Sequence, residues 1–241
     1  MERYQTTKFK TSLQGISLFA GLESHVLEQI HKDCAWRSYE PGDWIVNYLD
    51  NSNDVFFIAN GEVRVTIYSV SGKAVSFCDL GTGEVFGEYA AIDGQSRSAS
   101  VQARSSCEIA SLSAASFLKL LGNEPVLNRE LLRKLVKTIR MLDRRVYEFS
   151  TLAVNSRIRA ELLRIANLSP RKGKCAQVVP APTHVEIASR VSTHREAVTR
   201  ELTRLMRASI HPESAGADRQ RSGLVSLSGA HRGLKRRSWP D

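Results

Sequence analysis

The chain has 241 residues, of which 42% are hydrophobic and 24% charged, and its formal net charge is +9 at pH 7. This composition is typical of a globular protein with one large or two ordinary domains, and it excludes a disordered chain. No apolar run has the length that a membrane span needs, and the N-terminus lacks the apolar core of a signal peptide. We therefore expect a cytoplasmic protein with no membrane partner.

The positive charge is concentrated in the last third of the chain. Residues 1–150 contain 17 Lys and Arg against 18 Asp and Glu, whereas residues 151–241 contain 17 against 7. The first part is thus nearly neutral, and the second carries a net charge of +10. A neutral module joined to a basic one predicts that the basic part binds a polyanion.

The first half of the chain has the pattern of a β-rich domain. Residues 12–34 have apolar side chains at helical spacing, and between Ala35 and Leu112 the pattern changes to short β-branched runs such as DVFFIA, EVRVTIYSV and CEIASL. Glycines and Asn or Asp pairs separate these runs, which predicts an antiparallel sandwich or barrel. The segment ANGEV, at residues 59–63, predicts a β-hairpin.

One long helix is predicted next, over residues 123–152. Its apolar residues recur every three or four positions, at Leu127, Leu131, Leu135, Ile139, Leu142, Val146 and Phe149. This spacing is close to a heptad repeat, with Lys and Arg at the outer positions. The stripe can pack on its own domain or pair with a second copy, and the helix length and basic flanks favour a homodimer.

Residues 183–206, THVEIASRVSTHREAVTRELTRLM, have the pattern of a helix–turn–helix. Thr183 with Glu186 and Thr193 with Glu196 form two possible capping boxes around a break at residues 191–192. An ordinary charged amphipathic helix has similar features, but the basic surroundings favour DNA binding. The second helix would expose side chains suited to base edges in the major groove, namely His194, Arg195, Glu196, Thr199 and Arg200.

A second local signal lies in VFGEYAAIDGQSRSAS, at residues 85–100, where Glu88 stands nine residues ahead of Arg97. A surface ion pair is one interpretation. The neighbours favour a ligand site, because Gly87 permits close backbone approach and Arg97 with Ser98 can donate to a phosphate. Glu88 can accept from a sugar hydroxyl. These groups on one short turn predict a site for a ribose cyclic phosphate.

The order of elements and the segment FGEYAAIDGQSRSASV resemble the cAMP receptor protein and fumarate–nitrate regulator family of bacterial transcription factors. The resemblance covers about residues 15–208 and includes FFIANGEVRV, GEVFGE, RSAS, the long helix and STHREAVTRELTRL. In that family the Gly-Glu and Arg-Ser or Arg-Thr pairs bind ribose and cyclic phosphate, and they match Gly87, Glu88, Arg97 and Ser98. The family's recognition-helix residues match Arg195, Glu196 and Arg200.

The resemblance implies an α+β fold in four parts. These are an N-terminal antiparallel, jelly-roll-like β-roll at residues 12–122, a long dimerisation helix and hinge at 123–152, a winged-helix-type helix–turn–helix domain at 153–210, and a basic tail at 211–241. It further implies a regulator of transcription and not an enzyme, with a cyclic nucleotide as effector and no metal or tightly bound cofactor. The implied partners are a second copy, a palindromic DNA site and RNA polymerase.

Three positions depart from the family's pattern. In cAMP-responsive members a Thr-Ser pair of the long helix touches the adenine, and the matching place here holds Leu142 and Asp143. Asp143 could accept from adenine's amino group or from guanine's N1 and N2, or it could pair with a neighbouring arginine, so cAMP is favoured by family frequency and cGMP is the alternative. Ser192 stands where a turn glycine is often found. The wing pattern is degraded after Ile210, so the tail is either disordered or a degraded wing.

Three alternative functions can be compared with the sequence. A family member that needs no effector, or another ligand, fits the sequence if Glu88 and Arg97 have a structural role only. An oxygen sensor would need clustered cysteines, whereas Cys34, Cys78, Cys107 and Cys175 are far apart. A cupin-type enzyme would need several histidines on its strands, and residues 35–112 contain none.

Overall fold

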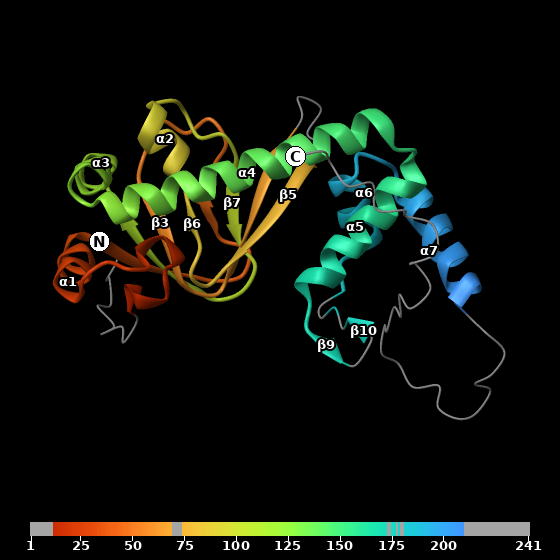
Figure 1. Ribbon diagram of the computed structural model, residues 1–241, viewed down its shortest axis with the longest axis horizontal. Coiled ribbons are helices and arrows are strands. Elements are labelled where there is room, and N and C mark those ends of the chain that lie inside the picture. The colour runs from red at the N-terminus through yellow and green to blue at the C-terminus, as the bar shows by residue number, and fades with distance from the viewer. Residues whose placement is uncertain (1–11, 69–73, 173–174, 177, 179–180, 210–241) are drawn as a thin grey trace, which may run out of the picture. The chain divides into compact units, whose positions relative to one another are not determined.

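The computed structural model describes residues 12–68, 74–172, 175–176, 178 and 181–209 (Figure 1). It divides into two compact units, residues 1–143 and residues 144–241. The predicted tail at 211–241, and with it the question of a wing, lies outside the described residues. Our division of the chain into four parts stays a prediction.

Two four-stranded antiparallel sheets form the body of the first unit (Figure 1). The first sheet contains, in spatial order, β1 (Ala35–Tyr39), β8 (Cys107–Leu112), β3 (Val55–Asn60) and β6 (Val85–Phe86). The second contains β2 (Trp44–Val46), β7 (Ser100–Ala103), β4 (Glu62–Tyr68) and β5 (Ala74–Gly81). The predicted β-roll is thereby confirmed.

The hairpin predicted at residues 59–63 is wrong. β3 pairs with β8 and β6, whereas β4 pairs with β5 and β7, so the two strands belong to different sheets. Gly61, with φ +96°, carries the chain from one sheet to the other, and a Cβ there would lie 2.6 Å from the Ser106 carbonyl oxygen. Ile58 and Val63 then enter the same core from opposite sheets. The Asn-Gly signal identified the sharp turn, but core packing decided which strands pair.

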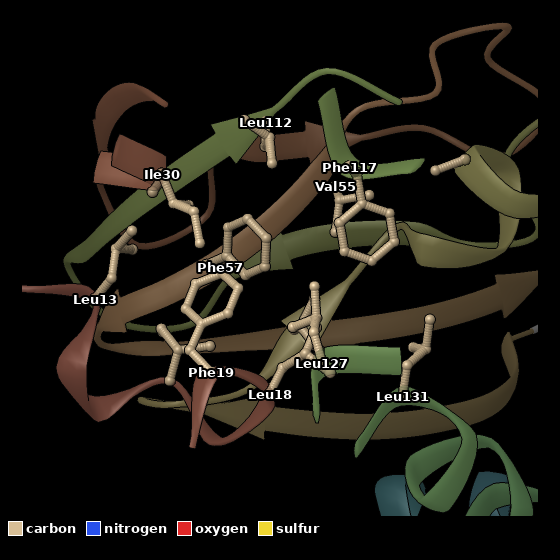
Figure 2. Close-up of a cluster of buried hydrophobic side chains, with 14 of the residues drawn as sticks. Leu13, Leu18, Phe19, Ile30, Val55, Phe57, Leu112, Phe117, Leu127 and Leu131 are labelled. Atoms are coloured by element: carbon tan, nitrogen blue, oxygen red, sulfur yellow. The ribbon is translucent and has the colours of Figure 1, made fainter. Parts of the chain in front are cut away.

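The apolar run of β3 is explained by burial on both of its faces. Val55 and Phe57 belong to one core cluster and Ile58 to another, as the two-residue period of a strand requires. The first cluster is covered by two 3₁₀ turns (Leu13–Gly15 and Ser17–Phe19) and by α1 (Ser24–Asp33), α3 (Ala114–Asn123) and the start of α4 (Pro125–Thr151). Figure 2 shows their side chains meeting around Phe57.

The predicted long helix is present as α4, but its apolar stripe has two different environments. Leu127 and Leu131 are buried in the core of the first unit. Further along, Ile139, Leu142 and Val146 are 56%, 50% and 64% exposed. The stripe therefore packs on its own domain at its start and offers an apolar surface over its later turns.

Within its described residues, the second unit contains the last turns of α4 and the helices α5 (Val154–Leu168), α6 (His184–Arg190) and α7 (Arg195–Ser209). A two-stranded hairpin of β9 (Arg171–Lys172) and β10 (Cys175–Ala176) follows α5. Ile158 of α5, Ile187 of α6 and Val198 of α7 pack in one small core, which confirms the helix–turn–helix. The capping box of Thr183 and Glu186 is present, whereas α7 begins two residues after Thr193.

Among the described residues, no helix is both long and apolar enough to cross a membrane. Nor does that part of the chain bring together three or more His, Cys, Asp or Glu side chains that could hold a metal ion.

Candidate functional site

The predicted ligand residues lie where β6 meets a short helix, α2 (Glu88–Asp93). Gly87 caps this helix with φ +84°, and a Cβ on it would lie 2.7 Å from Arg97 Nη1 and 2.8 Å from the Asp54 carbonyl oxygen. Only glycine fits both the backbone conformation and the space. Our prediction that one short turn links Glu88 to Arg97 is wrong, because α2 forms from the small apolar residues between them.

Arg97 is buried, with only 3% of its surface exposed. Its Nε donates to Ser52 Oγ at 3.0 Å, Nη1 to the Gly87 carbonyl at 3.1 Å and Nη2 to the Asp54 carbonyl at 2.9 Å. Burial lowers the pKa of the guanidinium, and the nearby Asp54 and Asp50 partly oppose that shift. The three hydrogen-bond acceptors are neutral oxygens, so this buried cation lacks an anionic partner at ion-pair distance among the described residues.

Glu88 is 5% exposed and does not pair with Arg97. Its Oε1 lies 2.6 Å from Nζ of Lys134, a residue of α4, and the same ammonium donates to the Val85 carbonyl at 2.6 Å. The surface ion pair that we considered is therefore excluded, since Glu88 is neutralised by a different cation. Two buried charges with separate partners thus lie close to Gly87.

Lys134 is the residue that sequence reasoning missed. It lies between Leu131 and Leu135, so the helical period places it at the edge of the buried stripe of α4. This position could have identified Lys134 from the sequence, because a lysine at the edge of a buried stripe needs a polar partner. Tyr89 on α2 also lies near Thr138 of α4, and burial together with the neighbouring Glu88 raises the pKa of the tyrosine. Two consecutive residues of α2 thus lie next to α4.

The remaining two predicted ligand residues are exposed. Ser98 lies on the surface directly after Arg97, where its hydroxyl could supplement the guanidinium. Asp143 is exposed on α4, and no contact joins it to the other four residues within the described chain. The structure therefore brings Gly87, Glu88 and Arg97 together, and the roles of all five residues stay predictions.

The exposed face of α7 carries the predicted DNA-contacting residues. Val198 is fully buried and Leu202 is 8% exposed, so this side of the helix packs on α5 and α6. The opposite side exposes His194, Arg195, Glu196, Thr199 and Arg200. Ser192 lies in the turn between α6 and α7 with φ +49°. This is the backbone conformation expected at a position where a glycine is often found.

Many arginines of the second unit are engaged within the protein. Glu161, 1% exposed, accepts from Arg164 and lies 3.5 Å from Arg190 Nη1 and 3.9 Å from Arg145 Nη2. Glu201, 2% exposed, pairs with Arg159 and Arg204. Our prediction that the basic part of the chain binds a polyanion therefore does not extend to these side chains in the conformation described.

Comparison with protein families gives one match, a cyclic nucleotide-binding domain at residues 36–124. Among curated proteins, the cAMP-activated global transcriptional regulator CRP of Pasteurella multocida is 28% identical over 180 residues, covering 74% of this chain and 86% of its own length. The Cyclic AMP receptor protein of Thermus thermophilus is 28% identical over 190 residues, covering 79% and 85%.

Solved structures give the same result. The Catabolite Activator Protein of Thermus thermophilus matches with a TM-score of 0.53 and 27% identity, covering 80% of this chain and 87% of its own. The c-di-GMP responsive regulator CLP of Xanthomonas campestris matches with a TM-score of 0.67 at 19% identity, which shows a shared fold. The relatives are transcription regulators, and they agree with our expectation of a protein that is not an enzyme.

Proposed function

We propose that this chain, a cyclic-nucleotide-responsive transcription regulator of the cAMP receptor protein and fumarate–nitrate regulator family, is a homodimer that binds cAMP and recognises a palindromic DNA site. RNA polymerase as a partner and a cytoplasmic location belong to the same proposal and rest on the family. The ligand would bind at Gly87, Glu88, Arg97 and Ser98, with Asp143 near its base.

The observation that carries the ligand proposal is the buried charge of Arg97, which has no carboxylate at ion-pair distance among the described residues. A buried cation is costly unless an anion neutralises it. Here the partners are two carbonyls and one hydroxyl, which use three of the five N–H groups of a guanidinium. A cyclic phosphate would supply the missing negative charge, and Ser98 would add a donor. Glu88, whose charge is neutralised by Lys134, would accept from the ribose hydroxyl.

The dimer proposal rests on α4. Leu132, Leu135, Ile139, Leu142, Val146 and Phe149 follow one another at alternating steps of three and four, which is the heptad spacing of a coiled-coil seam. Five of these six side chains are at least 40% exposed, so the seam is open to a partner. A second copy offers the same seam, and pairing through it would give a two-fold axis that matches a palindromic site.

In the proposed mechanism, the nucleotide shifts an equilibrium between two dimer arrangements. Lys134 and Thr138 provide the physical connection, because a ligand hydroxyl at Glu88 has to share the carboxylate with the ammonium of α4. In the favoured arrangement the two α7 helices would stand about 34 Å apart, one turn of DNA, with Arg195, Glu196 and Arg200 at base edges.

The test of the ligand proposal is calorimetric titration of the purified chain with cAMP and with cGMP, repeated on Glu88→Gln. We expect saturable binding of one or both nucleotides, with about 10- to 100-fold weaker affinity in the variant, since a hydrogen bond to a charged group is removed. Glu28→Gln, which changes an exposed carboxylate of α1, serves as the control and should bind as the unaltered chain does. Equal affinities of all three proteins would refute the role of Glu88.

A second candidate is a regulator that needs no cyclic nucleotide. It is favoured by the internal partners of both charges, since Lys134 already satisfies Glu88 and three oxygens already satisfy Arg97. Absence of binding heat with either nucleotide, together with sequence-specific DNA binding in a selection from random duplexes, would favour this candidate over the first.

The DNA part of the proposal has its own experiment. Arg195→Ala should weaken binding to the selected palindrome more than binding to random DNA, because a base contact carries specificity and a phosphate contact does not. An equal weakening on both probes would make Arg195 a phosphate-binding residue only.

A further inference from the structure

A histidine outside the predicted DNA-binding set is tied to the exposed face of α7. His184 is the first residue of α6 and is half-buried, and its Nδ1 lies 2.8 Å from Oγ1 of Thr199. Thr199 is one of the side chains that we assigned to DNA. The contact therefore places an imidazole against the same face of the helix–turn–helix as Arg195 and Arg200.

The hydrogen bonds of Thr199 favour one tautomer of His184. Thr199 Oγ1 also lies 3.1 Å from the Arg195 carbonyl oxygen, which can only accept. A threonine hydroxyl has one hydrogen, so if it is donated to that carbonyl, the contact with the ring requires a proton on Nδ1. Both hydrogen bonds are then satisfied together. In the neutral ring Nε2 is a bare acceptor, and in the protonated ring it becomes a second donor.

We propose that His184 is a DNA-contacting residue that donates from Nε2, as an imidazolium, to a backbone phosphate, and that Thr199 acts as its positioning residue. This rests on the proposed DNA-binding function. A phosphate oxygen can only accept, so the interaction needs a proton on Nε2, which is taken up from solvent on binding. Imidazole is the side chain that takes up a proton between about pH 5 and pH 8. Affinity for DNA therefore rises as the pH falls through this range.

The charged groups around His184 belong to α5, α6 and α7. On α7 the exposed ones are Arg195, Glu196, Arg200, Arg204 and Arg207, with His194 just before the helix; Glu201 is buried against Arg159 of α5 and Arg204. On α5, Glu161 and Arg164 pair with each other, and Arg157 contacts the Phe149 carbonyl and ring. On α6 itself Glu186 is bound to Thr183, and Arg190 pairs with Glu161. The exposed arginines of α7 thus outnumber its exposed carboxylate, Glu196, and DNA phosphates would supply the anion for an imidazolium at His184.

The experiment measures the affinity of the full chain for a fluorescently labelled pool of random-sequence duplexes at constant ionic strength from pH 8 to pH 6. We expect the affinity to increase towards pH 6 by up to tenfold per pH unit for each coupled proton. His184→Gln should remove the part of this dependence that belongs to His184, and His184→Arg should give high affinity at both ends of the range. Thr199→Val should reduce the pH-dependent part, and Thr199→Ser, which keeps the hydroxyl, should restore it.

His25 is the control, since it is an exposed histidine of α1 and lies outside the predicted DNA-binding set. His25→Gln should keep the pH dependence that His184→Gln removes. At pH 6, His184→Gln should also lower the slope of log affinity against log salt by about 0.9 for each phosphate that the protein no longer neutralises, with no change at pH 8. Unaltered pH dependence and salt slope in His184→Gln would overturn the proposal for His184, whereas a chain that binds no DNA at any pH would overturn the proposed function itself.

Discussion

At the scale of single residues, the site depends on a glycine that has no substitute. Gly87 combines a left-handed φ of +84° with neighbours 2.7 and 2.8 Å from the place of a Cβ. We expect Gly87→Ala to lower the free energy of unfolding by more than the roughly 1–2 kcal/mol of the left-handed backbone alone, because Arg97 has to move. Nucleotide affinity should fall with it. Chemical denaturation and calorimetry measure the two effects.

Gly94 is the matched control for Gly87, since it has φ +69° at the other end of α2 and open space where a Cβ would stand. Gly94→Ala should therefore show the effect of the backbone alone and leave nucleotide affinity unchanged. If both variants lost the same stability and the same affinity, crowding against Arg97 would have no part in the site.

Ser192 shows the opposite case, a non-glycine residue in a conformation that favours glycine. Its φ of +49° at the α6–α7 turn costs more for serine than for glycine. We expect Ser192→Gly to stabilise the helix–turn–helix by about 0.5–1 kcal/mol, measured by denaturant unfolding. Ser192→Ala keeps the Cβ and should give no gain. Destabilisation by glycine would mean that the serine hydroxyl has a role in the turn.

A single thiol should make stability depend on pH in the alkaline range. Burial, with the adjacent Asp33 adding to it, raises the pKa of Cys34 from 9.0 to about 12. Between these two values the unfolded chain loses the thiol proton while the folded chain keeps it. The contribution to stability is thus complete below pH 9 and is lost as the pH rises towards 12. Denaturation midpoints at increasing pH should fall less steeply in Cys34→Ala, and identical slopes would contradict the burial of this thiol.

At the scale of elements, α4 carries a prediction about assembly. Ile139 and Leu142 are both at least 50% exposed at consecutive seam positions. A glutamate at either position would place like charges opposite each other across a dimer seam. We expect Ile139→Glu to convert the protein to a monomer in light scattering without loss of helical content. Lys137→Glu is the control, since Lys137 is exposed on α4 outside the seam and its substitution should leave a dimer. A dimeric Ile139→Glu protein would place the interface elsewhere.

Most elements could be predicted from the sequence because their signals are local. The apolar run of β3, the alternation in β4, the heptad spacing of α4 and the cap at Thr183 all reflect neighbours within a few residues. The pairing of β3 could not be predicted, since it is decided by which core its side chains enter. The partner of Glu88 was missed because this contact is also non-local: Lys134 is 46 residues away in the chain.

At the scale of the whole molecule, a buried ion network holds the second unit together. Glu161 on α5 is contacted by Arg164 of its own helix, by Arg190 of α6 and by Arg145 of α4. Arg145 also donates to the Arg190 carbonyl at 3.1 Å, and Glu148 binds Arg164 with both oxygens at 2.9 Å. The last turns of α4 are thus part of the same packed unit as α6.

Removing one charge from this network should be strongly destabilising. Glu161→Gln leaves clustered arginines without their central anion, and breaking a buried pair in this way costs about 3–5 kcal/mol. The control is Glu201→Gln, whose partners Arg159 and Arg204 have side chains that are 40% and 58% exposed and can regain water. Denaturation followed by a probe in the second unit should show the larger decrease in stability for Glu161→Gln. Equal decreases would indicate that the network does not act as one unit.

The formal charge of the molecule is larger than the charge that can contact DNA. The salt dependence of DNA affinity measures the difference. Residues 151–241 contain 17 Lys and Arg, yet Arg159, Arg164 and Arg190 already have carboxylate partners. Counterions are released only where a cation reaches a phosphate, so an internally paired arginine adds little to the slope of log affinity against log salt. We expect Arg207→Gln, which removes an exposed cation of α7 that is not assigned to a base, to lower that slope by about 0.9 for each phosphate left without its cation. Arg159→Gln should leave the slope unchanged while reducing stability. A change of slope in Arg159→Gln would show that Glu201 releases this arginine to DNA, and the formal charge of the second unit would then be a fair measure of its DNA-binding charge.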